Sequence, residues 1–284
     1  MTELDPDALR VKQLERWERA AAGWGKRAMR IRDWGMPVSI WMIQRLHLHP
    51  GHRVLELAAG PGDTGLLAAE LVTPGGTLVS SDATETMLEI AQARARELQI
   101  ENAEFARLEL EWIDLPTGSV DAVLCRWGLM LCVDPEAAAR EIRRVLRPGG
   151  RVALAVWDDA GLNPWATIAW GALVTLGHEK PLAPGPPGIF ALAPGGALAE
   201  LLEAAGFVDV IVDGVELPRR FASVTEYIEE TLDLSVMFAQ AYGGLYDYEQ
   251  ADVVREIDKQ LAPFVGAGGV VTLPARSLVA AAGA

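Results

Sequence analysis

The chain has 284 residues, of which 50% are hydrophobic and 23% charged, a composition typical of a globular protein with one large domain or one domain with inserts. Its 39 acidic and 25 basic residues give a net charge of −14, which argues against nucleic acid as a partner, because phosphate binding needs a basic face. Only two cysteines, Cys125 and Cys132, are present, and they lie in an apolar stretch, so we expect buried thiols in a reducing compartment and no metal site.

Two stretches bear on secretion and membranes. The amino terminus is charged and amphipathic and has no apolar signal core. The run from Ala160 to Gly177 carries no charge, but Asn163, Pro164 and Gly171 within it favour a buried helix over a membrane span. We therefore expect a cytoplasmic protein with no membrane partner. These features do not predict an oligomeric state.

Helical spacing characterises the first part of the chain. Trp17 and Trp24 lie seven residues apart, on one face of a helix. Trp34 and Trp41 repeat this separation, so we expect two helices before the first strand.

Strands and helices then alternate. Short apolar runs predict five strands, at residues 52–57, 77–82, 103–108, 120–126 and 151–157. Helical patterns lie between them at residues 64–71, 84–98 and 134–146. Such alternation implies an α/β fold, in which helices cover both faces of a mostly parallel sheet.

The regular alternation of strands and helices stops after residue 157. A helix and a Pro/Gly-rich loop at 181–188 come first, followed by a helix at 196–205 and a strand at 208–215. We expect two further helices between residues 224 and 264 and one final strand at 270–280.

The loop after the first strand reads Gly60-Pro61-Gly62-Asp63-Thr64-Gly65, the G-x-G-x-x-G pattern of dinucleotide sites. The charges around it argue against a pyrophosphate. There is no Lys or Arg between Val54 and Ala93, while there are six carboxylates: Glu56, Asp63, Glu70, Asp82, Glu85 and Glu89. Like charges about 4–6 Å apart repel by on the order of 1 kcal/mol or more near a surface. The loop therefore favours a cationic ligand, and a glycine turn without a ligand is the open alternative.

Asp82 ends the second strand, 22 residues beyond Gly60. In an open α/β sheet an acidic residue there binds the ribose hydroxyls of an adenosine. It could equally cap the helix that follows, and the two roles are compatible. Together with Glu56 and the glycine loop, Asp82 predicts a site for an adenosine with a cationic tail.

Five segments in the same order resemble the class I S-adenosylmethionine-dependent methyltransferases, in particular the ubiquinone/menaquinone-biosynthesis and natural-product subgroup. They are VLELAAGPG (54–62), LVSSDATETMLEIA (78–91), DLPTGSVDAVLCRWGLMLCVDP (114–135), EIRRVLRPGGRVALAVW (141–157) and LLEAAGFVDV (201–210). The resemblance implies a Rossmann-like doubly wound sheet of seven strands and S-adenosylmethionine as the cofactor, with S-adenosylhomocysteine as its product.

The resemblance also implies roles for particular residues. Glu56 would support the loop near the cofactor amine, and Asp82 would bind the ribose. The family's three loop glycines correspond to Ala58, Gly60 and Gly62. Ala58 therefore departs from the family pattern, and alanine tolerates positive φ poorly. The remaining cofactor contacts implied are Ala83 and Met87 beside the adenine, Glu109 and Leu110 after the third strand, and Arg126 after the fourth.

The resemblance and the composition divide the chain. We interpret residues 1–50 as a helical lid, 51–157 as the cofactor-binding core, 158–194 as an insert over the acceptor site, 195–218 as a continuation of the core, 219–267 as a helical cap and 268–284 as the final core strand.

The expected reaction transfers a methyl group to a small, apolar or aromatic acceptor, with the acceptor atom undetermined. Aromatic residues near the carboxyl ends of strands are candidates for its pocket: Trp24, Trp127, Trp157, Trp165 and Phe190. Trp17, Trp34, Trp41 and Trp170 are expected in the core. No general base is identified, and His178 is the best placed of the four histidines, with an exposed loop residue as its plainer interpretation.

Three other functions stay open. A nicotinamide-dependent oxidoreductase would share the glycine pattern, although Glu56 opposes it. A protein that binds S-adenosylmethionine or S-adenosylhomocysteine without turnover fits the Ala58 departure and the missing base. A protein-modifying methyltransferase would need an open groove.

Overall fold

The computed structural model describes residues 5–183, 185 and 187–284. The first four residues of the amino terminus, and Pro184 and Pro186 of the expected Pro/Gly-rich loop, lie outside this description.

A seven-stranded sheet forms the centre of the molecule, in the order β3-β2-β1-β4-β5-β9-β6. Its strands are β1 (Arg53–Leu57), β2 (Thr77–Asp82), β3 (Ala103–Arg107), β4 (Val120–Arg126), β5 (Leu146–Trp157), β6 (Val208–Glu216) and β9 (Arg276–Gly283). The first five pair in parallel, and β9 runs antiparallel to both β5 and β6. The expected Rossmann-like α/β fold is confirmed. Because strand order reverses between β1 and β4, their carboxyl ends border the crevice where such sheets bind ligands.

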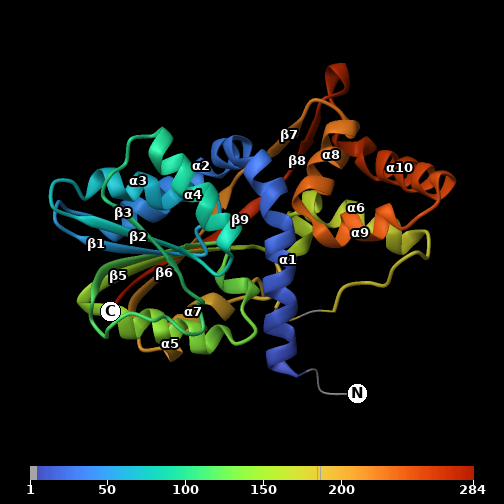
Figure 1. Ribbon diagram of the computed structural model, residues 1–284. Coiled ribbons are helices and arrows are strands. Elements are labelled where there is room, and N and C mark those ends of the chain that lie inside the picture. Colours follow the sequence, from blue (N-terminus) through green and yellow to red (C-terminus); the bar gives the residue numbers. More distant parts are fainter. Residues whose placement is uncertain (1–4, 184, 186) are drawn as a thin grey trace.

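Helices cover both faces of the sheet (Figure 1). One layer contains α2 (Ala28–Leu46), α3 (Asp63–Leu71) and α4 (Glu85–Glu97), and the other contains α5 (Pro135–Val145) and α7 (Ala197–Ala204). The start of α5 follows from its sequence, since the Asp134 carboxylate accepts from the N–H of Ala137 at 2.8 Å and Pro135 follows the cap.

A second group of helices stands beside the sheet and has its own core (Figure 1). It comprises α6 (Pro164–Thr175), α8 (Val224–Leu234), α9 (Val236–Gly243), α10 (Asp247–Leu261) and the small sheet of β7 (Arg219–Phe221) and β8 (Val271–Leu273). The helix α1 (Pro6–Lys26) packs against both α4 and α8, so it bridges the two groups. The uncharged run at 160–177 is a short 3₁₀ turn followed by α6, and α6 is buried against this second core. Within the described residues, no helix combines the length and apolarity that a membrane crossing requires.

Two expectations for the carboxyl-terminal third were wrong. Three helices, α8, α9 and α10, replace the expected two, because Ser235 ends α8 and caps α9 by accepting from the N–H of Phe238. The single strand expected at 270–280 is two strands, β8 and β9, in different sheets. Pro274 lies between them, and proline has no N–H to continue a ladder.

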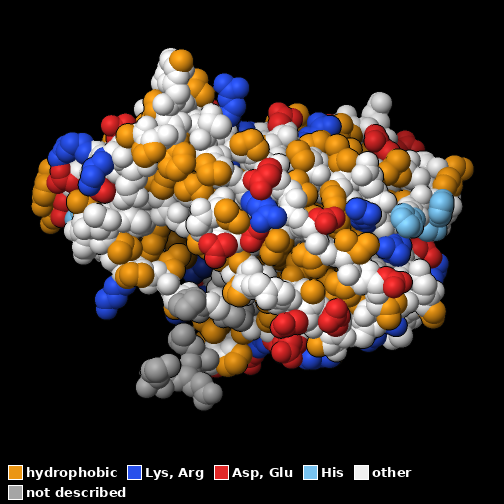
Figure 2. Space-filling model, turned by 180° about the vertical axis from the view of Figure 1, so that it is seen from behind, with side chains coloured by type: hydrophobic (Ala, Val, Ile, Leu, Met, Phe, Trp, Pro, Cys, Tyr) orange, Lys and Arg blue, Asp and Glu red, His pale blue; other side chains and the backbone are white. Residues whose placement is uncertain are grey.

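Charged side chains of both signs are dispersed on the face seen from behind, in Figure 2, among apolar and uncharged ones. The two cysteines are confirmed as buried free thiols.

Candidate functional site

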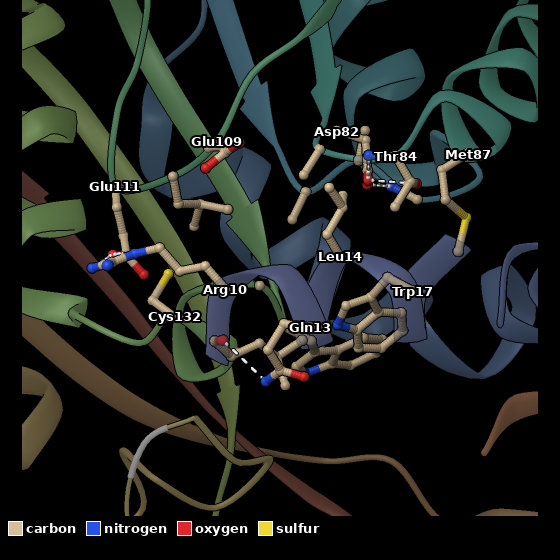
Figure 3. Close-up of a pocket in the computed structure, with 18 of the residues that line it drawn as sticks. Arg10, Gln13, Leu14, Trp17, Asp82, Thr84, Met87, Glu109, Glu111 and Cys132 are labelled. Carbon is tan, nitrogen blue, oxygen red and sulfur yellow. Dashed lines mark hydrogen bonds and ion pairs between the residues drawn. The ribbon is translucent and has the colours of Figure 1, made fainter. Parts of the chain in front are cut away.

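A cavity of about 270 Å³ lies at the carboxyl ends of β1, β2 and β4, and α1 covers it (Figure 3). Its floor comes from the loop after β1, from Asp82 and from the segments that follow β3 and β4. The residues that line it are Arg10, Val11, Gln13, Leu14, Trp17, Trp24, Glu56, Ala58, Ala59, Gly60, Pro61, Asp82, Ala83, Thr84, Met87, Glu109, Leu110, Glu111, Arg126, Trp127, Gly128, Leu131, Cys132 and Val133.

Glu56 is held beneath the glycine loop. Its carboxylate accepts from the N–H of Gly65 at 2.6 Å and from the hydroxyl of Ser80 at 3.0 Å. Burial raises the pKa of Glu56 to about 7, against the lowering effect of these hydrogen bonds and of Arg126. The carboxyl group is therefore poised to ionise when a cation reaches the cavity.

The loop adopts a left-handed backbone at three positions. Ala58, Gly60 and Gly62 have φ values of 49°, 53° and 86°. For alanine this conformation is strained by roughly 1–2 kcal/mol, so the Ala58 departure is accommodated at a cost. Close packing against this loop also explains why residue 128 is a glycine: a side chain there would collide with the Cβ of Ala58.

Asp82 both fastens the loop and starts the next helix. One carboxylate oxygen accepts from the N–H of Gly60 at 2.9 Å, and the other accepts from the N–H and hydroxyl of Thr84 at 3.0 and 2.9 Å. Burial raises the pKa of Asp82. The capping role and a role toward a ligand coexist, because Asp82 also lines the cavity.

Charges from other parts of the chain change the electrostatic expectation. Asp63 does not line the cavity, and it is buried in ion pairs with Arg94 at 2.9 Å and Arg126 at 3.2 Å. The region is therefore not purely acidic. The charge count from the sequence covered only residues 54–93 and did not include these arginines, although both pack against the loop.

The residues 48–170 match the family model described as a methyltransferase domain. The chain is 32% identical over 119 residues to the ubiquinone/menaquinone biosynthesis C-methyltransferase UbiE of Pasteurella multocida, covering 42% of this chain and 44% of that protein. It is 33% identical over 184 residues to nocamycin O-methyltransferase of Saccharothrix syringae, covering 61% and 65%. The fold resembles the YcgJ protein of Bacillus subtilis, with a TM-score of 0.60 at 18% identity over 87% of this chain and 98% of the other.

Residues 48–170 are therefore a methyltransferase domain. The matched region contains β1 to β5, the glycine loop and Asp82. The chain spans about half the length of the first curated relatives that it matches.

Most of the cofactor residues expected in the methyltransferase domain meet at the cavity. Glu56, Ala58, Gly60, Asp82, Ala83, Met87, Glu109, Leu110 and Arg126 all line it. Gly62 does not, and it is instead the residue from which α3 begins.

The aromatic residues expected at the acceptor pocket lie partly at the cavity and partly in the core. Trp24 and Trp127 line the cavity, whereas Trp157, Trp165 and Phe190 pack in or against the core and are not among its lining residues. His178, which follows α6, does not line it either.

On the inner face of α1, only Trp24 was predicted from the sequence to lie at the cavity. Arg10, Gln13, Leu14 and Trp17 all lie over the cavity, although Trp17 was expected in the core. The signal was present in the seven-residue spacing that puts Trp17 beside Trp24, whose rings meet edge to face with centroids 5.5 Å apart.

An ion pair joins α1 to the methyltransferase domain at one end of the cavity. The guanidinium of Arg10 binds one oxygen of Glu111 at 2.6 and 2.8 Å, as Figure 3 shows. The other oxygen of Glu111 accepts from the N–H groups of Val133 and Asp134. Arg10 is therefore anchored to a carboxylate that the core itself holds in place.

Proposed function

We propose that this protein transfers a methyl group from S-adenosylmethionine to a small, apolar or aromatic acceptor. The proposal rests on one observation: Glu56, the glycine loop and Asp82 line the same cavity, within a methyltransferase domain. The small organic molecules in the names of two relatives, ubiquinone/menaquinone and nocamycin, support an acceptor of this kind.

The cavity suits each part of an adenosine with a cationic tail. Asp82 would bind the ribose hydroxyls, while Leu110 and Met87 offer apolar contacts and Glu109 an acceptor for the adenine amino group. Glu56 lies at the other end of the loop, where it would face an ammonium. The lining carboxylates Glu56, Asp82, Glu109 and Glu111 outnumber the lining arginines, and both arginines are already in ion pairs.

The sulfonium of the bound cofactor supplies an already activated methyl group. The chain then has to align the acceptor with it and keep water out, which can account for roughly 7–11 kcal/mol of the barrier in favourable cases. α1 would exclude water, since its apolar residues Leu14, Trp17 and Trp24 line the cavity. No side chain at the cavity is assigned as a general base, and His178 stays outside it.

The acceptor would approach across Trp127, which follows β4 and lines the cavity. The other aromatic residues proposed for the acceptor are Trp24 on α1, and Trp157, Trp165 and Phe190. These last three pack in or against the core and do not line the cavity.

Ligand binding and turnover are both testable. We expect S-adenosylhomocysteine to raise the melting temperature and NADH to leave it unchanged. We further expect S-adenosylmethionine carrying a labelled methyl group to label members of a panel of phenols, amines and activated carbon acids. Stabilisation by NADH alone would indicate an oxidoreductase. Tight cofactor binding with no labelled product across the panel would indicate a protein without turnover.

Replacing Asp82 with alanine is expected to weaken S-adenosylhomocysteine binding by roughly 1–3 kcal/mol, because charged hydrogen bonds to the ribose are lost. Calorimetric titration measures the change. Thr84→Val is the matched control: it removes the hydroxyl that binds Asp82 but leaves the carboxylate in place. An unchanged affinity in a folded Asp82→Ala variant contradicts the ribose assignment.

Replacing Arg10 with methionine is expected to speed S-adenosylhomocysteine dissociation about 2- to 5-fold, because a partly exposed ion pair contributes roughly 0.5–1 kcal/mol. Stopped-flow displacement gives the rate. Arg19→Met on the same helix is the control, since Arg19 is exposed and donates only to the carbonyl of Glu15. Equal dissociation rates in both variants would show that α1 does not limit release.

A further inference from the structure

Arg126 is a buried arginine at the carboxyl end of β4, and it lines the cofactor cavity. Its side chain is 9% exposed. The guanidinium carbon lies 4.6 Å from the ring centroid of Trp127. On the other side is Gly35 of α2, where an added Cβ would overlap Nη1 of Arg126. Close packing therefore holds the guanidinium at the edge of the cavity, away from bulk solvent.

This guanidinium has more donors than partners. An arginine presents five N–H groups. Among the described residues, Nη2 donates to the carboxylate of Asp63 at 3.2 Å and Nη1 donates to the hydroxyl of Ser39 at 3.4 Å. Both contacts are longer than the about 2.7–2.9 Å typical of charged hydrogen bonds. The donors that remain favour a ligand that brings acceptor oxygens, because unsatisfied buried donors are costly.

The charges around Arg126 favour an anionic group on that ligand. Asp63 is shared, since Arg94 pairs with it at 2.9 Å and Arg126 at 3.2 Å. Two cations and one carboxylate leave one positive charge. The nearby carboxyl group of Glu56 compensates it only in part, because burial raises the pKa of Glu56 to about 7.

Arg126 and Glu56 lie on neighbouring strands and on the same face of the sheet. Glu56 of β1 is opposite Leu124 of β4, and Arg126 is two residues further along β4. Residues directly opposite each other, and those two positions further on, point to the same face. An amino acid carries its ammonium and its carboxylate on one carbon atom, so these groups lie close together. A carboxyl group and a guanidinium placed in this way match both charges of an amino-acid tail.

We propose that Arg126 binds the carboxylate of the cofactor's amino-acid tail and makes the cavity selective for ligands in which this tail is intact. A guanidinium is suited to this role, because its planar fork can donate two parallel hydrogen bonds to a carboxylate. Asp63 acts as a positioning residue, since it holds Nη2 of Arg126 from the side of α3. This inference rests on the proposed function, because it assigns one lining residue a role toward S-adenosylmethionine.

The test compares two ligands that differ by one group. They are S-adenosylhomocysteine and its decarboxylated analogue, 5′-deoxy-5′-(3-aminopropylthio)adenosine, which keeps the ammonium. Calorimetric titration of the full chain gives both dissociation constants. We expect S-adenosylhomocysteine to bind about 10- to 30-fold more tightly, because hydrogen bonds between charged groups are lost with the carboxylate. The positive charge of the analogue works against this preference in a cavity lined by several carboxylates. Equal affinities, or tighter binding of the analogue, overturn the proposal.

Variants locate the preference. Arg126→Met leaves Asp63 paired with Arg94, so no buried carboxylate loses its last partner, and we expect the preference to fall below about threefold. Arg126→Lys keeps the charge without the planar fork and should give an intermediate preference, which serves as the test if Arg126→Met does not fold. Arg10→Met is the control, because Arg10 is the other arginine that lines the cavity, and it should keep the full preference.

Two results with the variants contradict the assignment. One is an unchanged preference in folded Arg126→Met or in Arg126→Lys, and the other is a preference lost in Arg10→Met. The same titrations separate this inference from the proposed function. Failure of the parent protein to bind either ligand counts against the methyltransferase proposal, whereas tight binding of both with equal affinity removes only the role of Arg126.

Discussion

Gly65→Ala is expected to destabilise the protein by roughly 2–4 kcal/mol and to weaken S-adenosylhomocysteine binding at the same time. A Cβ built at residue 65 overlaps the carboxylate of Glu56. The carboxylate would have to move, breaking its bonds to the N–H of Gly65 and the hydroxyl of Ser80. Alanine gains about 1 kcal/mol of helix propensity in α3, which is too little to offset a displaced buried carboxyl group.

Urea unfolding gives the stability and calorimetry gives the affinity. Gly243→Ala is the matched control, because Gly243 also lies in a helix and a Cβ added there meets no other atom within 4 Å. We expect the control to stay within about 0.5–1 kcal/mol of the parent protein. If both substitutions have the same small effect, Glu56 is not held as tightly as the geometry indicates.

The second large effect concerns pH. The pKa of Glu56 rises from an ordinary 4.5 to about 7 because the carboxyl group is buried. The folded protein therefore holds this proton more tightly than the unfolded chain. The resulting stability is fully present below pH 4.5 and is lost as the pH rises to about 7, by on the order of 3 kcal/mol.

Comparing the parent protein with Glu56→Gln isolates this contribution. Glutamine keeps an acceptor for the N–H of Gly65 but does not titrate, so the difference in free energy of unfolding should change by about 2–3 kcal/mol between pH 5 and pH 8. Glu101→Gln makes the same chemical change at an exposed glutamate and should leave the pH profile unchanged. Parallel profiles for the parent protein and Glu56→Gln would mean that Glu56 titrates normally.

Ionisation of Glu56 links the pH effect to the proposed function. A cofactor ammonium near the carboxyl group would favour its charged form and lower its pKa. Binding of such a cation would therefore offset the stability that the protein loses when the buried carboxyl group ionises.

Local sequence patterns were sufficient to predict the fold class and the residues expected around the cofactor. Alternating apolar runs and helical periods predict a sheet covered on both faces, because these patterns depend only on near neighbours in the chain. The ends of β1 and β2 were equally predictable. Glu56 and Asp82 lie at strand ends, and parallel strands bring such ends to one edge of the sheet.

Only the tertiary structure decided which charges and rings face the cavity. Arg126 and Arg94 neutralise Asp63 from 63 and 31 residues away in the chain, so counting charges near the loop overstated its acidity. Trp17 was expected in the core and lines the cavity, whereas Trp157 and Trp165 were expected in the pocket and pack behind Trp127. A helical or strand period gives the face on which a side chain lies, but not the element that the face meets. That contact depends on how α1 and the second helical group pack against the sheet, which no local pattern encodes.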